Sequence, residues 1–161
     1  QPTLNPDTNH LCRDLVLLDK LSLSHKPPTR GSIVLLTLPT NPDLTMVKRI
    51  TALEGDIVRP HYRDGTLAPN TLIRIPKGHC WVEADEPYHG MDSNSFGPVP
   101  LGLVRARVTY VLWPFERFGR LVERKAKPGT VVERGQFTEV EVVGSEDEAA
   151  NGKQSVVRIF K

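Results

Sequence analysis

The sequence has few cysteines, no excess of one charge and no long apolar run, and each shortage excludes a class of protein. Two cysteines in 161 residues are too few for a disulfide-dense scaffold. Lysine and arginine number 21 against 19 aspartate and glutamate, so the charge balance does not suggest binding to nucleic acid or to an anionic membrane surface. The longest apolar run, residues 32–38, is far shorter than the roughly 20 residues of a membrane-spanning helix.

Cysteine and histidine do not form a metal-binding pattern either. His79 and Cys80 are adjacent, so on a strand their side chains point to opposite faces and cannot easily hold one metal ion. His10 and Cys12 have the spacing of a ligand pair, but a second pair is lacking. We therefore expect no metal and no cofactor, and we expect Cys12 and Cys80 to be free thiols rather than a disulfide.

What the sequence does have is a β pattern punctuated by proline. Proline makes up 14 of the 161 residues, which argues against long helices because proline lacks a backbone N–H group. Ile33–Leu38 is apolar on both parities, as expected for a central buried strand. Similar strand patterns occur at 15–18, 46–53, 57–58, 71–75 and 79–84, with turns at 26–31, 39–42, 54–56 and 76–78. The expected fold is all-β, a barrel or orthogonal sandwich of short strands with long loops.

Two further segments complete this β pattern. Residues 85–100 have no periodicity and many turn residues, and a loop of that length inside a compact domain is usually functional. From Val104 to Leu112 apolar and polar residues alternate, which predicts a long strand that ends at Trp113-Pro114 and buries Val108 and Tyr110 on one face.

Lys48 is the most informative residue. Within the strand 46–53 it shares a parity with Met46, Ile50 and Ala52, so a lysine lies on an otherwise apolar face. Loss of water around an ammonium group lowers its pKa, and a neutral amine can act as general base for a serine hydroxyl. The same pattern also fits a strand lysine that extends to solvent or pairs with a carboxylate.

Four segments in chain order resemble motifs of one known family. They are Pro2-Thr3-Leu4-Asn5-Pro6, Arg30-Gly31-Ser32-Ile33-Val34, the segment from Val47 to Asp56 and the segment from Asp92 to Val99. They are similar to the end of the nucleophile motif Ser-Met-x-Pro-Thr, the strand motif Arg-Gly-Asp-Ile-Val, the lysine motif and the last motif of the type I signal peptidases, which use a Ser/Lys dyad. Segments 78–83, 92–99 and 112–114 resemble the mitochondrial inner-membrane branch of that family.

The resemblance implies a role for individual residues. Lys48 matches the general base, while Arg49 and Asp92 match positions that support the site by charge and hydrogen bonding. Ser93, beside Asp92 in the last motif, is assigned to the same supporting group. The nucleophilic serine is expected two residues before Gln1, outside this chain.

Other assignments remain open at this stage. Ser93 could itself be a nucleophile, although no histidine is spaced to partner it. Glu83, Asp85, Glu86 and Asp92 could supply an acid and a base, although a rim of solvated carboxylates is the usual case. Where many relatives have a serine that hydrogen-bonds the lysine, this chain has Gly90, which leaves the orientation of Lys48 open. Asp56 matches a turn carboxylate with a structural role.

The division of the chain follows the extent of the resemblance. Residues 1–117 are predicted to form the catalytic domain of the signal-peptidase type. Residues 118–161 are predicted to be an extension that adds edge strands, with strand patterns at 131–132, 137–143 and 156–160 and a flexible acidic loop at 145–154.

For function, the resemblance implies a serine endopeptidase that removes sorting segments from precursor proteins at the intermembrane-space face of the mitochondrial inner membrane. It also implies a heterodimer with a sister protease subunit, a membrane helix upstream of this chain, and no nucleic-acid partner. One alternative is a non-catalytic β scaffold, favoured by the missing serine and by Gly90. Another is a self-cleaving repressor-type Ser/Lys domain, against which the lack of a DNA-binding segment and the Trp113-Pro114 signature count.

Overall fold

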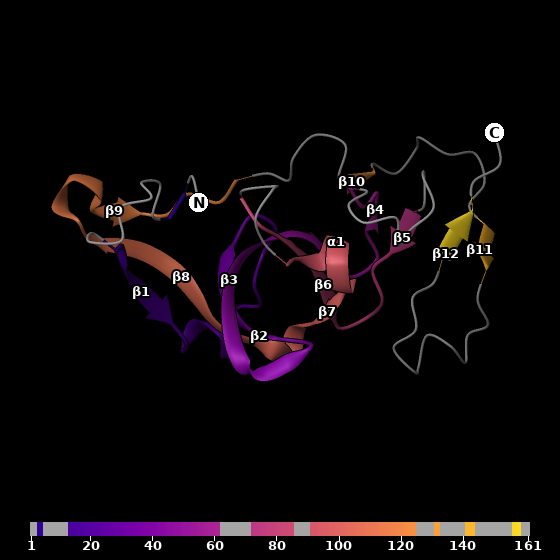
Figure 1. Cartoon of the computed structure of the whole chain (residues 1–161), viewed down its shortest axis with the longest axis horizontal. Helices are drawn as coiled ribbons and strands as arrows, with labels where there is room; N and C mark the ends of the chain where they lie inside the picture. Colours follow the sequence, from indigo (N-terminus) through magenta and orange to yellow (C-terminus); the bar gives the residue numbers. More distant parts are fainter. Residues whose placement is uncertain are drawn as a thin grey trace.

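The computed structural model describes residues 3–4, 13–61, 72–85, 91–124, 131–132, 141–143 and 156–158. Over these ranges the chain forms β-strands, one four-residue helix and three short 3-10 turns (Figure 1). The prediction of an all-β fold is confirmed. The expected loop at 145–154, together with Cys12, Glu86 and Gly90, lies outside the described residues.

The larger sheet is antiparallel and has the strand order β1-β8-β2-β3-β6-β7, with β9 also pairing with β8. Its strands are β1 (Leu15–Asp19), β2 (Ile33–Leu38), β3 (Asn41–Leu53), β6 (His79–Glu83), β7 (Val99–Pro100), β8 (Val104–Trp113) and β9 (Gly119–Arg120). The helix α1 (Ser93–Phe96) and the 3-10 turns η1 (Ser22–Ser24), η2 (Leu101–Leu103) and η3 (Phe115–Arg117) connect them. The predicted loop 85–100 therefore contains α1 and β7.

The smaller sheet has the order β10-β4-β5-β12-β11. It consists of β4 (Ile57–Val58), β5 (Leu72–Arg74), β10 (Val131–Val132), β11 (Glu141–Val143) and β12 (Val156–Arg158). Strand β10 pairs with β4, and β12 pairs with β5, so strands from the last part of the chain flank a central pair on both sides. Strands β11 and β12 lie at the end of the molecule opposite β1 (Figure 1).

The hairpin of β2 and β3 is longer than its hydrophobic pattern indicates. We predicted a turn over 39–42 and a strand from Met46, but the turn occupies only Pro39 and Thr40, and β3 begins at Asn41. Residues 41–45 are exposed, so they carry no apolar alternation that could mark them as a strand.

Strand β8 lies where it was predicted, but Tyr110 is not on its buried face. Tyr110 is 37% exposed, whereas Val111 is 3% exposed. The pairing with β1 joins Leu17 to Tyr110 but Leu18 to Val108, so one residue of β8 is skipped. Such an irregularity moves the following side chains to the other face, which an unbroken alternation cannot foresee.

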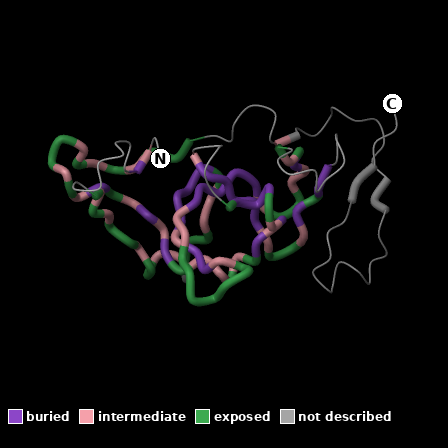
Figure 2. Tube along the Cα trace, in the orientation of Figure 1, coloured by how far each residue is buried: buried purple, intermediate pink, exposed green. Residues whose placement is uncertain are grey.

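Strand β3 is buried on both faces in its second half, over residues 48–52, and Figure 2 shows the buried chain concentrated in the middle of the molecule. One face packs on the inner cluster, which comprises Val34, Leu36, Ile50, Cys80, Val82 and Val99. The other packs on the outer cluster, which comprises Leu4, Ile33, Val108 and Val111. Met46 belongs beside the inner cluster and Val47 beside the outer one, as alternation along a strand requires.

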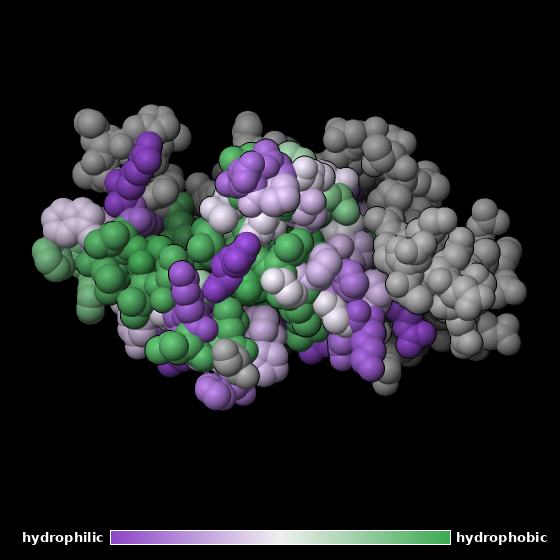
Figure 3. Space-filling model, turned by 90° about the horizontal axis from the view of Figure 1, so that it is seen from below, coloured by the Kyte–Doolittle hydropathy of each residue, from purple (hydrophilic) through white to green (hydrophobic). Residues whose placement is uncertain are grey.

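Large apolar side chains are exposed over β1 and the end of β8 (Figure 3). They include Leu15, Leu17, Leu18, Trp113 and Phe115. The rings of Trp113 and Phe115 meet edge to face with centroids 4.9 Å apart. No helix among the described residues is long and apolar enough to cross a bilayer.

Candidate active site

Lys48 lies in the buried half of β3, opposite Val34 of β2, and is 7% exposed. On the same face of β3, Ile50 belongs to the inner cluster and Met46 packs against it. The apolar face predicted around Lys48 is therefore present from Met46 to Ile50. Ala52 packs in a different cluster, beyond a register shift between β3 and β6.

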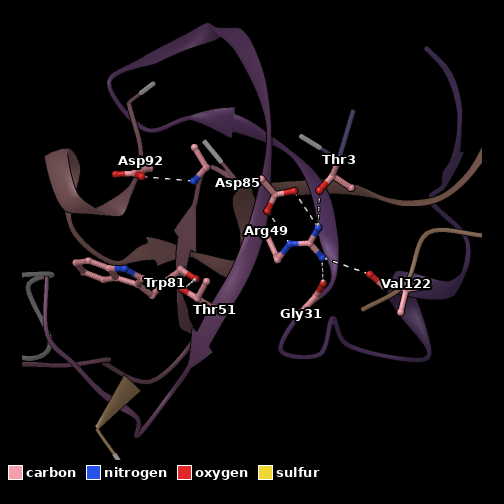
Figure 4. Close-up of polar contacts among 9 residues, drawn as sticks. Thr3, Gly31, Arg49, Thr51, Trp81, Asp85, Asp92 and Val122 are labelled. Atoms are coloured by element: carbon pink, nitrogen blue, oxygen red, sulfur yellow. Dashed lines mark hydrogen bonds and ion pairs between the residues drawn. The ribbon is translucent and has the colours of Figure 1, made fainter. Parts of the chain in front are cut away.

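Arg49 projects from the opposite face of β3 and makes a two-point ion pair with Asp85. Its Nε donates to Oδ1 over 2.8 Å and its Nη2 to Oδ2 over 2.9 Å (Figure 4). Arg49 is 5% exposed, and a charge buried to that extent needs such a partner. Burial raises the pKa of Asp85, but hydrogen bonds from Arg49 and Thr3 outweigh that effect, and the pKa is lowered from its usual value.

The remaining donors of Arg49 reach three other segments of the chain. Nη1 donates to the carbonyl of Gly31 over 2.8 Å and, more weakly, to that of Val122 over 3.5 Å. Nη2 also lies 3.4 Å from the hydroxyl of Thr3 (Figure 4). One guanidinium thus joins the N-terminal segment, the turn before β2, β3 itself and the residues after β9 to Asp85.

Asp92 caps a helix and does not pair with Arg49. It is the N-cap of α1, where Oδ1 accepts the backbone N–H of Asn94 over 3.0 Å and its side-chain amide over 3.1 Å. Its other oxygen accepts the N–H of Ala84 over 3.4 Å. The partner of Arg49 is therefore Asp85, and Asp92 ties α1 to the end of β6.

Ser93 strengthens the same junction. It is 1% exposed, and its hydroxyl oxygen accepts the backbone N–H of Val82 over 2.9 Å. Val82 is the partner of Ile50 in the β3–β6 pairing, so the last motif is held against the strand next to Lys48. Burial and engagement with the backbone favour a supporting role for Ser93 over that of a nucleophile.

The other acidic candidates do not share a site among the described residues. Glu83 accepts from the indole of Trp81 over 3.2 Å, while Asp85 and Asp92 are held by the contacts given above. Asp56 accepts two bonds from Arg30, over 2.7 and 2.8 Å, and one from the N–H of Leu53, so it fixes the turn before β4 as expected.

Cys80 is a buried free thiol in the inner cluster. Burial raises its pKa to about 12, so the reactive thiolate form is disfavoured. Its role is therefore packing rather than chemistry.

Three of the four motifs meet at one small hollow, which has room for about one water molecule. It is lined by Leu4, Ile33, Val47, Lys48, Arg49 and Asp85. Leu4 comes from the segment that resembles the nucleophile motif, Ile33 from the strand motif and Lys48 from the lysine motif. The fold therefore brings the residue proposed as base and the end of the nucleophile motif to the same place.

Comparison with known proteins agrees with these motifs. The family model described as signal peptidase, peptidase S26, matches residues 1–71. Mitochondrial inner membrane protease subunit 2 of Mus musculus is 48% identical over 75% of this chain, and subunit 1 of Xenopus tropicalis is 36% identical over 76% of this chain and 71% of its own length. This chain belongs to the S26 signal peptidase family. Within that family it is similar to the mitochondrial inner membrane proteases.

Two further facts define the extent of this S26 similarity. The chain spans 66% of the length of the Mus musculus relative, slightly less than two thirds. A signal peptidase I of Enterococcus faecalis is 22% identical, with a TM-score of 0.43 over 52% of this chain and 98% of that one.

Sequence reasoning missed two residues of this candidate site. Asp85 was considered only as an acid or base, and Thr3 only as part of a motif. A buried arginine on a strand requires a carboxylate partner. Glu83 pairs with Arg49 in the β3–β6 ladder, and Asp85 comes two residues after Glu83. That signal becomes visible only when the strand pairing is known.

Proposed function

We propose that this chain carries the general base of a Ser/Lys endopeptidase that removes sorting segments from precursor proteins at the intermembrane-space face of the mitochondrial inner membrane. The observation that carries the proposal is Lys48, buried on the apolar face of β3 at the position of the lysine motif. The names of the S26 relatives, mitochondrial inner membrane proteases, support the location and the reaction class.

The reaction proposed is acyl transfer. A neutral Lys48 takes the proton of the serine hydroxyl as its oxygen attacks the scissile carbonyl, and returns it to the leaving amine. In the second step Lys48 takes a proton from the water that attacks the acyl-enzyme, and it passes this proton to the serine oxygen as the acyl–oxygen bond breaks, which restores the serine hydroxyl and the neutral lysine. The proposed mechanism requires Lys48 in its neutral form, and backbone N–H groups near the serine would stabilise the oxyanion.

The supporting residues act by position in this proposal. Arg49 and Asp85 fix β3 relative to Thr3, which lies four positions after the expected serine. Asp92 and Ser93 fix α1 against β6, the strand that pairs with β3. Proton transfer needs heavy atoms within about 3 Å, so such anchoring sets the rate.

The partners proposed are precursor proteins and a sister protease subunit. The relatives are named as subunits of inner membrane proteases, which supports assembly with another protease chain. A heterodimer and a membrane helix upstream of Gln1 remain proposals.

The test compares two versions of the chain with the same precursor and partner subunit. One version is residues 1–161, and the other is extended upstream through Ser-Met. We expect turnover only by the extended version, because the shorter one has a base without its attacking oxygen. Equal turnover by both would place the nucleophile within residues 1–161, and absence of turnover by both would favour a non-catalytic scaffold.

A further inference from the structure

A short segment after β9 is fastened to the larger sheet. Residues 121–124, here called the strap, follow β9 directly. The backbone N–H of Leu121 donates to the carbonyl of Thr109 in β8 over 2.9 Å, and the side chain of Leu121 packs against the outer cluster. The strap is therefore held at its first residue by both a hydrogen bond and apolar contact.

Glu123 joins the strap to the turn that precedes β2. Its Oε1 accepts from the hydroxyl of Thr29 over 2.8 Å and from that of Ser32 over 3.1 Å. The turn is closed on itself, because the N–H of Thr29 donates to Ser32 Oγ over 3.2 Å. The hydrogen bond from Thr29 is the main cause that lowers the pKa of Glu123, so the carboxylate is charged at neutral pH.

Gly31 lets the strap approach the turn closely. It has a φ of +88°, and a Cβ built on it would lie 2.5 Å from the carbonyl oxygen of Arg124. A side chain there would push the strap away, in addition to the strain of a positive φ. Glycine at this position thus serves the contact as well as the turn.

The same turn is bound to β3 on either side of Gly31. The N–H of Gly31 donates to the carbonyl of Ile50 over 2.7 Å, and the N–H of Ile50 donates to that of Ser32 over 2.9 Å. The guanidinium of Arg49 donates to the Gly31 carbonyl. Contacts therefore run from Glu123 through the turn to the two residues that follow Lys48.

Ser32 differs from the motif that its segment resembles. The strand motif it resembles is Arg-Gly-Asp-Ile-Val, and here serine stands at the aspartate position. The strap supplies a carboxylate from residue 123 to the same turn, 91 residues away in sequence. A carboxylate is thus present at the turn although the motif position has none.

We propose that Glu123 is a positioning residue, which clamps the turn 29–32 onto β3 and so holds Lys48 in register with the segment that follows the nucleophile. This inference rests on the proposed function, because it assigns to the strap a part in aligning the base.

The test uses the serine-containing full chain with its partner subunit. Glu123→Ala should lower kcat about tenfold, since small misplacements of reacting groups are costly, and leave KM within about twofold because binding contacts are kept. Glu123→Gln retains an acceptor oxygen and should keep most of the activity. The matched control is Glu116→Ala, an exposed acidic residue of η3. A kcat for Glu123→Ala equal to that of the control would overturn the proposal.

A second pair of variants tests the carboxylate at the turn. Ser32→Asp alone places two carboxylates together and should lower kcat, whereas Ser32→Asp with Glu123→Ala should recover most of the lost rate. A double variant no better than Glu123→Ala would show that kcat does not depend on an acceptor oxygen at the turn.

Amide hydrogen exchange separates the clamp from the chemistry. In Glu123→Ala the amides of Gly31 and Ile50 should exchange faster, while those of Cys80 and Val82 in β6 should not change. Unchanged exchange would overturn the clamp itself, and faster exchange with unchanged kcat would overturn its catalytic part. Failure of the proposed function would instead appear as full activity of a Lys48→Ala variant, whatever Glu123→Ala does.

Discussion

At the scale of single residues, Arg49 uses a rigid guanidinium with five N–H donors to bind five oxygen atoms of four residues, each on a different segment. The position of Lys48 on an apolar face could be predicted, because strand parity depends on neighbouring residues alone. The partner of Arg49 could not, because Asp85 is 36 residues away and is brought near only by the pairing of β3 with β6.

Asp85→Asn tests this ion pair through stability. The variant leaves a buried guanidinium without its counter-charge, so it should unfold with a free energy about 3 kcal/mol lower near neutral pH. The folded-state pKa of Asp85 lies below its unfolded value of about 3.9, so its contribution is present above that pH and is lost as the pH falls through the folded pKa. Urea unfolding should therefore show the two proteins converging in acid.

Asp43→Asn provides the matched control for that experiment. Asp43 is an exposed carboxylate of the same strand, and its replacement should change the unfolding free energy by less than about 0.5 kcal/mol. A difference between wild type and Asp85→Asn that stays constant down to acid pH would contradict the assigned pair.

At the scale of elements, the alternation in 104–112 predicted the strand β8 but not the point where its faces exchange. The exchange depends on a register shift against β1, and no residue in β8 marks it. In β3 the apolar pattern predicted the faces but not the length of the strand, because pairing with β2 extends the strand beyond its apolar half.

Substitutions in β8 test which face is buried. Val111→Ala should lower the free energy of unfolding by about 2 kcal/mol, because it removes methyl groups from the outer cluster. Tyr110→Ala, at a half-exposed position, should cost less than about 1 kcal/mol. If Tyr110→Ala lowered the free energy of unfolding more than Val111→Ala in thermal or urea unfolding, the buried face would be the one predicted from alternation.

Ser93→Ala tests the junction of α1 and β6. It removes the acceptor of the Val82 N–H and should lower stability by about 1–2 kcal/mol. Turnover of the serine-containing chain should fall no more than about tenfold, as for a positioning residue. A loss on the order of 10⁶-fold, the effect of removing a nucleophile, would show that Ser93 attacks the substrate.

At the scale of the whole molecule, the strand patterns predicted in the last part of the chain fall at β10, β11 and β12. Their pairing with β4 and β5 could not be predicted, because short strands of similar composition do not specify their neighbours. The proposed boundary at residue 118 also cuts before β9 and the strap, which bind the larger sheet.

Two truncations test that boundary. A chain ending at Arg124 and one ending at Arg117 should both unfold cooperatively, with the shorter one less stable because it lacks β9 and the strap. The measurement is calorimetric unfolding of each version. Loss of a cooperative transition in the chain ending at Arg124 would show that the last segment is integral to the fold.

The most direct measurement of the central claim is precursor cleavage by the serine-containing chain and its partner with Lys48 replaced by arginine. Arginine keeps the charge but stays protonated, so it cannot serve as a general base. We expect Lys48→Arg to remain folded, to retain precursor binding and to show no cleavage above that of a variant without the serine. Substantial cleavage by Lys48→Arg would contradict the assignment of Lys48 as the base.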